Sequence, residues 1–341
     1  MEQVVIEHKR LEYIDALRGF TMILVVFHHV IGHLFYSESS INDLFITFRM
    51  PLFFFISGFM SYTTYSPDLI KKRIKNRLLG QLLPTIVTCF IFISLFSIPL
   101  KETLMDPQKS GYWFTIAMVE IFLIFILAIL IINKLNLSKK FQCILFCCIS
   151  AMAYFIKAIL NNYSLFDNTV ICLLSISKTL QFIPFFFMGI IAKMYSSQFL
   201  SLIKKEYFMS VCIIGFIFFV YSKSFSSSSM AGFLGIIIFF RLFEKYQSYL
   251  SSNTVLGFSL GYIGKRTLEI YLFHYFIISS LKSSSGTFQN YLTGTWIDDI
   301  IIYLPLTLLV ISLCLLFDTI IKIAAPIHSL MFGFKAKKAI K

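Results

Sequence analysis

Long apolar segments alternate with short polar connections along almost the whole chain. Ten of these segments are each close to the roughly 20 residues that a helix needs to cross about 30 Å of hydrocarbon. Only helices and closed barrels satisfy their backbone hydrogen bonds inside lipid, so the pattern predicts an all-α integral membrane protein. The predicted spans lie near residues 14–35, 42–63, 79–99, 112–133, 141–160, 171–193, 207–222, 229–246, 262–281 and 299–321.

Composition and charge placement agree with this prediction. Of the 341 residues, 57% are hydrophobic and only 14% are charged, whereas soluble domains are typically about 25% charged. Most of the 30 lysines and arginines fall in every second connection, which the positive-inside rule assigns to the cytoplasm. We therefore expect both termini in the cytoplasm and a single transmembrane domain over residues 1–341. The net charge of +13 marks the cytoplasmic face and does not require a nucleic-acid partner.

The first span contains an arginine and a histidine with ten residues between them, Arg18 and His29. Eleven steps of about 100° make three turns plus roughly 20°, so both side chains face the same way, about 16 Å apart. Ionisable residues inside a bilayer cost roughly 2.5–3.5 kcal/mol each on insertion scales. This stripe is therefore predicted to be functional, although Asp15, within one turn of Arg18, could simply neutralise it.

Polar residues of other spans are predicted at similar depths in the bilayer: Arg49 in the second, Glu120 in the fourth, Lys178 in the sixth and His274 in the ninth. Because such residues usually face a cavity or one another, we expect them to converge. Structural alternatives stay open. Arg49 could reach the outer surface, Glu120 could pair with Lys178 or an arginine, and His274 could be a packing residue.

A basic segment, residues 70–78, precedes the third span and contains Arg73 and Arg77. It could rest on anionic lipid at the membrane surface, or it could bind phosphate groups. The seven cysteines fall inside predicted spans and none has the spacing of a zinc site, so no metal or prosthetic group is predicted.

Several motifs together resemble the acyltransferase-3 family of membrane O-acyltransferases. Arg18 and His29 are followed by Met50-Pro-Leu-Phe-Phe-Phe-Ile-Ser-Gly-Phe59 and by the basic segment. Weaker matches are Tyr112-Trp-Phe114, Ile183-Pro-Phe-Phe-Phe-Met-Gly189 and Ile263-Gly-Lys-Arg-Thr-Leu-Glu-Ile-Tyr-Leu-Phe-His274, all in the family's order. The basic motif of the family is usually Arg-x-x-Arg, whereas Arg73 and Arg77 stand one residue further apart.

The resemblance is closest to the single-domain O-acetyltransferases of bacterial surface polysaccharides. It implies ten spans in the bacterial inner membrane, with Arg18 and His29 essential. It also implies acetyl transfer from cytoplasmic acetyl-CoA to a hydroxyl of a surface polysaccharide or lipid-linked glycan. The expected partners are membrane lipid, acetyl-CoA as donor substrate and the glycan acceptor.

The residues fit this chemistry. Neutral imidazole is a base near pH 7, so His29 could take the proton of the acceptor hydroxyl or carry the acetyl group covalently. Arg49 could stabilise the oxyanion. Arg18, Arg73 and Arg77 could hold the donor, and the remaining binding candidates are Glu120, Lys178 and His274.

Two other functions would also place charges midway through a helix bundle. The first is a secondary transporter or a lipid-linked glycan flippase, although the chain shows no matched pair of Gly- or Pro-broken spans of the inverted-repeat kind. The second is transfer of another acyl group, such as succinyl.

Overall fold

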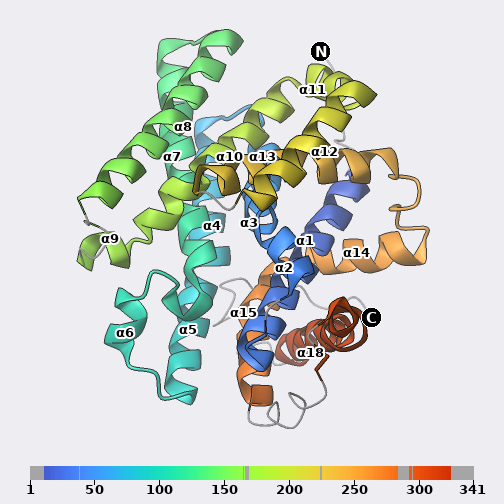
Figure 1. The fold of residues 1–341 in the computed structure, drawn as a ribbon. Coiled ribbons are helices and arrows are strands. Elements are labelled where there is room, and N and C mark those ends of the chain that lie inside the picture. The colour runs from blue at the N-terminus through green and yellow to red at the C-terminus, as the bar shows by residue number, and fades with distance from the viewer. Residues whose placement is uncertain are drawn as a thin grey trace.

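The computed structural model describes residues 11–37, 39–163, 165, 169–222, 225–282, 292–293 and 295–323. Within these residues the regular structure is entirely helical. Seven of the described helices are long and apolar enough to cross a membrane. These helices confirm the predicted all-α membrane class. In Figure 1, α1 and α3 lie near the centre, with α7 and α8 on one side and α14 and α18 on the other.

The first half of the chain forms three helical segments that are bent or broken, followed by a long hairpin. Its elements are α1 (Glu12–Val30) with the π-helical η1 (Ile31–Phe35), α2 (Ser40–Ile46), α3 (Arg49–Ser61), α4 (Pro67–Arg77) with the π-helical η2 (Leu78–Leu82), α5 (Leu83–Leu95), α6 (Leu100–Met105), the 3₁₀ turn η3 (Lys109–Gly111), α7 (Trp113–Leu135) and α8 (Lys139–Asn162).

The second half adds shorter helices around this core. Its elements are α9 (Thr169–Leu173), α10 (Ile176–Met194), α11 (Ser196–Ile203), α12 (Glu206–Tyr221), α13 (Phe225–Lys245), α14 (Val255–Lys265), α15 (Thr267–Leu281), α17 (Trp296–Asp298), the π-helical η6 (Asp299–Tyr303) and α18 (Leu304–Ile323).

Each predicted span contains a helix, but three of the spans differ from the structure in their bounds. The predicted span 171–193 joins the end of α9 to α10 across Ser175, which stands between the two helices. The third apolar helix begins at Pro67 and runs to Leu95 without a break, so the basic segment forms the first part of that helix. The predicted span 262–281 joins the end of α14 to α15 across Arg266, where the helix breaks. Helices α12 and α15 are shorter than 18 residues, so the count of ten spans remains a prediction.

Helices α3 and α10 cross with their backbones in contact at two glycines. A Cβ atom on Gly58 would lie 1.9 Å from the carbonyl oxygen of Phe186, and one on Gly189 would lie 2.0 Å from that of Phe55. Small residues allow membrane helices to approach this closely and to gain van der Waals contact. The crossing fixes α3, and with it Arg49 and Ser57, against the body of the protein.

The same device joins α1 to α14. A Cβ atom on Gly264 would lie 1.8 Å from the carbonyl oxygen of Asp15, and one on Gly19 would lie 2.0 Å from that of Leu260. Gly19 directly follows Arg18. The contact therefore sets the position of the polar stripe of α1.

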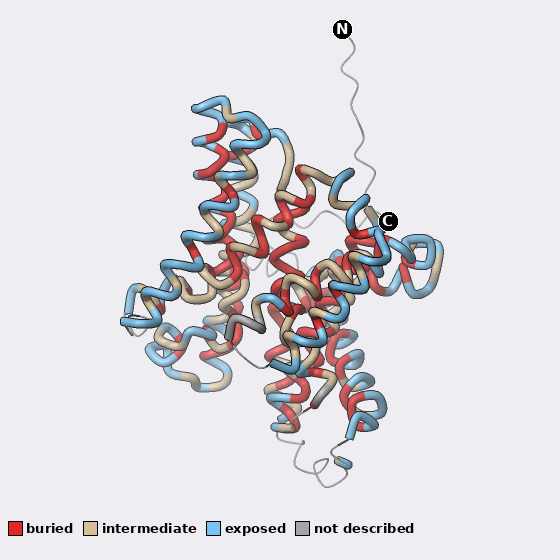
Figure 2. The backbone as a smooth tube through the Cα atoms, turned by 45° about the horizontal axis from the view of Figure 1, so that its top comes forward, coloured by how far each residue is buried: buried red, intermediate tan, exposed pale blue. Residues whose placement is uncertain are grey.

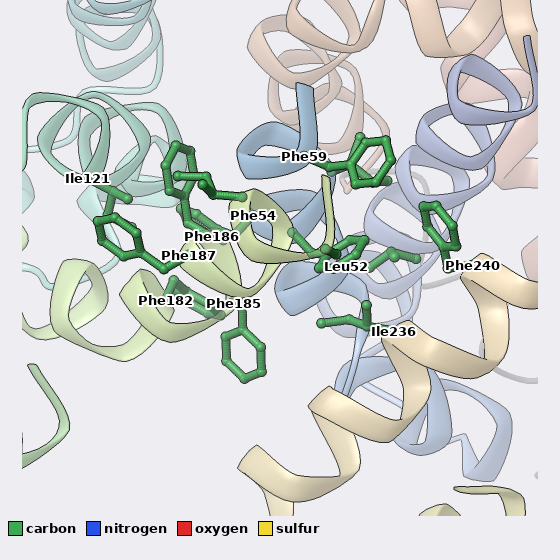
Figure 3. Packing of buried hydrophobic residues seen from close by; sticks show 14 of the residues in the cluster. Leu52, Phe54, Phe59, Ile121, Phe182, Phe185, Phe186, Phe187, Ile236 and Phe240 are labelled. Atoms are coloured by element: carbon green, nitrogen blue, oxygen red, sulfur yellow. The ribbon is translucent and has the colours of Figure 1, made fainter. Parts of the chain in front are cut away.

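Aromatic side chains fill the space around the α3–α10 crossing. Phe54 and Phe182 stack with their ring centroids 4.5 Å apart and their planes 6° from parallel. Phe186 and Phe187 of α10 and Phe240 of α13 extend this cluster (Figure 3). A second buried cluster joins the C-terminal half of α1 to α15 and α18. Buried residues concentrate in the middle of the molecule (Figure 2).

The peripheral helices leave apolar side chains uncovered. Examples are Leu127 of α7, Phe155 of α8 and Ile214 of α12, which are 60%, 64% and 68% exposed. Contiguous apolar surface on this scale is rare in soluble monomers. It is the surface expected where helices meet lipid.

The α1–α14 contact predicts that substitution of two glycines of α14 has different effects on the stability of the protein. Gly264→Ala should destabilise the protein by about 2 kcal/mol or more, because its Cβ would meet the Asp15 backbone, which cannot yield as a flexible side chain would. Gly261→Ala is the matched control, since a Cβ there meets nothing within 4 Å. Thermal unfolding of both variants in detergent would measure the loss of stability. The amount of each variant in the membrane would show whether it still folds in cells. Equal stability of the two variants would contradict the contact.

Candidate functional site

A cavity of about 1180 Å³ lies between the two buried clusters and takes its walls from both. It exceeds the roughly 300–1,000 Å³ of a typical small-molecule site, so it has room for two substrates. Asp106 is its only carboxylate among the described lining residues. The cationic lining residues are Arg18, Arg49, Arg73, Arg77, Lys178 and Lys282. This excess of positive charge favours anionic ligands.

Arg18 and His29 both line this cavity, in agreement with the same-face geometry predicted from their spacing. The Arg18 guanidinium donates to the Thr267 hydroxyl over 3.1 Å, at the first turn of α15. His29 meets Tyr275, eight residues further along α15. Helices α1 and α15 therefore run side by side in the same direction, and Arg18 and His29 mark two levels of one cavity.

The side chains of Gln81, Ser57 and Phe122 contact Arg77, which lies near Arg18 at the cavity. The Arg77 guanidinium donates to the Gln81 side-chain oxygen over 2.6 Å and to the Ser57 hydroxyl over 3.4 Å. It also lies over the Phe122 ring, 5.0 Å from the centroid. Arg18 is close enough to interact electrostatically with Arg77. The positive charges of α1 and α4 thus gather at one end of the cavity.

The spacing of Arg73 and Arg77 suits helix α4. Residues four apart lie on one helix face, and both arginines are half-buried at the cavity while Lys71, Lys72 and Lys75 are exposed. Arg73 donates to the Tyr65 hydroxyl over 3.0 Å. The extra residue relative to Arg-x-x-Arg therefore still leaves both guanidinium groups on one side.

His29 has a tyrosine partner. The Tyr275 hydroxyl oxygen lies 3.1 Å from Nε2 and 3.4 Å from Nδ1 of His29, and the two ring centroids are 4.9 Å apart. His28, the neighbouring residue, hydrogen-bonds instead with the side chain of Asn42 in α2. Of these two adjacent histidines, His29 is the one joined to α15.

Arg49 is the first residue of α3 and is 6% exposed. Its Nε and Nη1 atoms are buried and have no hydrogen-bond partner. It is close enough to interact electrostatically with both His29 and Tyr275. Hydrogen-bond donors buried without an acceptor are costly, and these line a cavity beside a histidine. Arg49 therefore faces the cavity and does not reach away to the surface.

Lys178 and a polar loop line the end of the cavity away from the arginine cluster. The Lys178 ammonium lies over the Trp113 ring, 5.1 Å from the centroid, and is attracted electrostatically by Asp106. The Asp106 carboxylate accepts from the backbone N–H groups of Gln108 and Ser110 over 2.8 and 3.0 Å. This end therefore presents cations, an amide and a hydroxyl.

Glu120 and His274 do not line the cavity. Glu120 accepts a hydrogen bond from the Thr179 hydroxyl and forms no ion pair with Lys178. His274 is fully buried, and its Nδ1 lies 3.1 Å from the carbonyl oxygen of Ile270. The His274 ring packs on Tyr275, with centroids 4.2 Å apart. Both residues lie behind the wall and could act only through it.

The sequence analysis missed Tyr275 and Gly111. Gly111 adopts φ +96°, and a Cβ there would lie 2.1 Å from the Tyr275 ring. Tyr275 directly follows the motif ending in His274, so the adjacency was a signal. Nothing local to Gly111 indicates that it contacts a residue more than 160 positions away.

Comparison with known families decides the class. The family model for the acyltransferase-3 family, described as an acyltransferase domain, matches residues 11–319. The chain belongs to the acyltransferase-3 family. No curated protein and no solved structure matches it.

Membership in the acyltransferase-3 family confirms the resemblance seen in the motifs. The match includes every described helix up to the last turn of α18 and all of the cavity-lining residues discussed above. Together with the apolar helices, it identifies a multi-pass membrane acyltransferase.

Proposed function

We propose that this acyltransferase moves an acetyl group from cytoplasmic acetyl-CoA to a hydroxyl of a surface polysaccharide or its lipid-linked precursor. The observation that carries the proposal is the single cavity with three arginines at one end and the His29–Arg49 pair further along it. The first end suits the phosphates of CoA, and the second suits acyl transfer. On this proposal the protein resides in the bacterial inner membrane.

At the donor end, Arg18, Arg73 and Arg77 bind CoA phosphates. Guanidinium groups match phosphate geometry with two parallel hydrogen bonds and stay charged when partly buried. The thioester lies at the end of the long pantetheine arm of CoA. Phosphates held at the arginine cluster therefore allow the thioester to extend towards His29, about 16 Å along α1 from Arg18.

At the reacting end, a nitrogen of His29 takes the proton of the acceptor hydroxyl as that oxygen attacks the thioester carbonyl. Negative charge develops on the carbonyl oxygen, and the unpartnered N–H groups of Arg49 can donate to it. The carbon–sulfur bond then breaks. The CoA thiolate leaves and takes up the proton held by the imidazolium, which restores neutral His29.

The acceptor enters from the opposite end. There the cavity is lined by Lys178, Asp106, Gln108 and Ser110, side chains of the kind that hydrogen-bond sugar hydroxyls. With donor and acceptor binding from different ends, neither substrate has to cross the membrane completely.

The role of His29 can be tested in cells. His29→Ala should remove O-acetylation of the surface polysaccharide because His29 is the proposed base, within hydrogen-bond distance of the Tyr275 hydroxyl and close to Arg49. Proton NMR of the purified glycan before and after mild base would measure the acetyl signals in wild type, deletion and variant, with the membrane level of the protein checked by immunoblot. Acetylation that persists in the variant refutes the His29 assignment. Reduced glycan with intact acetylation would favour transport instead.

The donor end makes a separate prediction. Arg73→Ala combined with Arg77→Ala should raise the apparent KM for acetyl-CoA roughly 10- to 100-fold or more, since even one charge-assisted hydrogen bond contributes about 1.5–3 kcal/mol. The matched control is Lys72→Ala with Lys75→Ala, which removes the same charge from exposed positions of α4. Transfer of radiolabel from acetyl-CoA in isolated membranes measures both. An unchanged KM in the arginine variant, or an equal rise in the control, contradicts the phosphate role.

A further inference from the structure

We propose that Tyr275 is a positioning residue for His29. We also propose that Gly111, which we call the seat, leaves the space that the Tyr275 ring occupies. The proposal rests on the acyl-transfer function proposed above and extends it to a residue outside the motifs that indicate the family. Neither position was a candidate on sequence grounds. The geometry that joins them is an interaction of α1, α15 and the turn that ends at Gly111.

The first observation is the contact with His29. The Tyr275 hydroxyl lies against the ring edge that carries both nitrogens, at 3.1 Å from Nε2 and 3.4 Å from Nδ1. Tyr275 is 8% exposed, so water competes little for this hydrogen bond. Neutral imidazole has one N–H and one lone pair, and the partner of one nitrogen decides which nitrogen remains basic.

The second observation is the enclosure of the Tyr275 ring. One neighbour is the His274 ring, with centroids 4.2 Å apart. Another is Gly111, where a Cβ would lie 2.1 Å from both Cε2 and Cζ of Tyr275 and 2.5 Å from its hydroxyl oxygen. Only a residue without a side chain allows the tyrosine to occupy this place. The φ of +96° at Gly111 also favours glycine.

The third observation is that the seat is itself held rigidly. The Tyr271 hydroxyl donates to the carbonyl oxygen of Gly111 over 3.1 Å. The Tyr112 hydroxyl donates to the carbonyl oxygen of Leu272, also over 3.1 Å. These reciprocal bonds tie the turn before α7 to α15, one turn from Tyr275. A base that is oriented by a fixed third group is a recurring arrangement in nucleophilic catalysis.

The consequence for the reaction is an oriented imidazole. With one ring N–H donating to the Tyr275 oxygen, the other nitrogen keeps its lone pair for the acceptor hydroxyl. Without Tyr275 the ring can rotate or hold its proton on the other nitrogen, and only a fraction of the molecules is ready to react. Donor binding at the arginine cluster, where Arg18 lies about 16 Å along α1 from His29, is unaffected.

The test compares Tyr275→Phe with Tyr13→Phe in purified protein in lipid nanodiscs. The probes are radiolabelled acetyl-CoA and the surface polysaccharide of the source strain after removal of its O-acetyl groups by mild base. Tyr275→Phe keeps the ring on Gly111 and should lower kcat about 10- to 100-fold with an unchanged KM for acetyl-CoA. Tyr13→Phe removes the hydroxyl of another buried tyrosine, which does not line the cavity and takes no part in the contacts around Gly111, and should keep its kcat.

A second variant tests the seat. Gly111→Ala should displace the Tyr275 ring and lower kcat in the same way, with KM for acetyl-CoA again unchanged. If Gly111→Ala fails to fold, Tyr275→Phe still decides the proposal. A wild-type kcat in Tyr275→Phe overturns it, as does a loss that is equal in Tyr13→Phe or that appears in KM alone. Failure of the proposed function is distinguishable, because wild type itself would then transfer no acetyl group to the glycan.

Discussion

An arginine or histidine within a bilayer must be surrounded by protein or water, since exposure to hydrocarbon costs roughly 2.5–3.5 kcal/mol even on insertion scales. This constraint explains why the charged residues of separate helices share one space. Arg18, Arg49, Arg73, Arg77 and Lys178 come from four helices, and all five line the same cavity. The outward faces of the peripheral helices are left apolar.

Glycine contacts make this arrangement possible. Backbone approach at Gly58 and Gly189 locks α3 to α10, and approach at Gly19 and Gly264 locks α1 to α14. The two contacts hold the helices that carry Arg49 and the Arg18–His29 stripe. The helices touch backbone to backbone at these crossings. The cavity lies elsewhere between the helices, on the sides to which the polar residues point. Packing thus determines the cavity, and the cavity determines which polar side chains can react together.

The local sequence pattern was sufficient to predict the helices and to predict which side of α1 carries Arg18 and His29. Hydrophobic length predicted the helical segments, and the period of 3.6 residues placed Arg18 and His29 on one side of α1. Depth in the bilayer was a weaker guide. Glu120 and His274 were predicted at a depth similar to that of the cavity residues, but their side chains do not line the cavity. The direction in which a side chain points depends on how its helix is rotated, and packing against neighbouring helices sets that rotation. Tyr275 and Gly111 needed the tertiary structure, because they meet through contacts more than 160 residues apart. The continuation of α4 into α5 through a π-helical turn was equally absent from the pattern.

On the function proposed here, one cavity receives the donor at the arginine cluster and the acceptor at the opposite end. Acetyl transfer in proteoliposomes of a single, verified orientation tests it most directly, with de-O-acetylated polysaccharide on one side and acetyl-CoA on the other. Acetylated glycan is expected only when acetyl-CoA is on the side where α4 lies and the glycan is on the far side. Transfer that requires both substrates on the same side would contradict it.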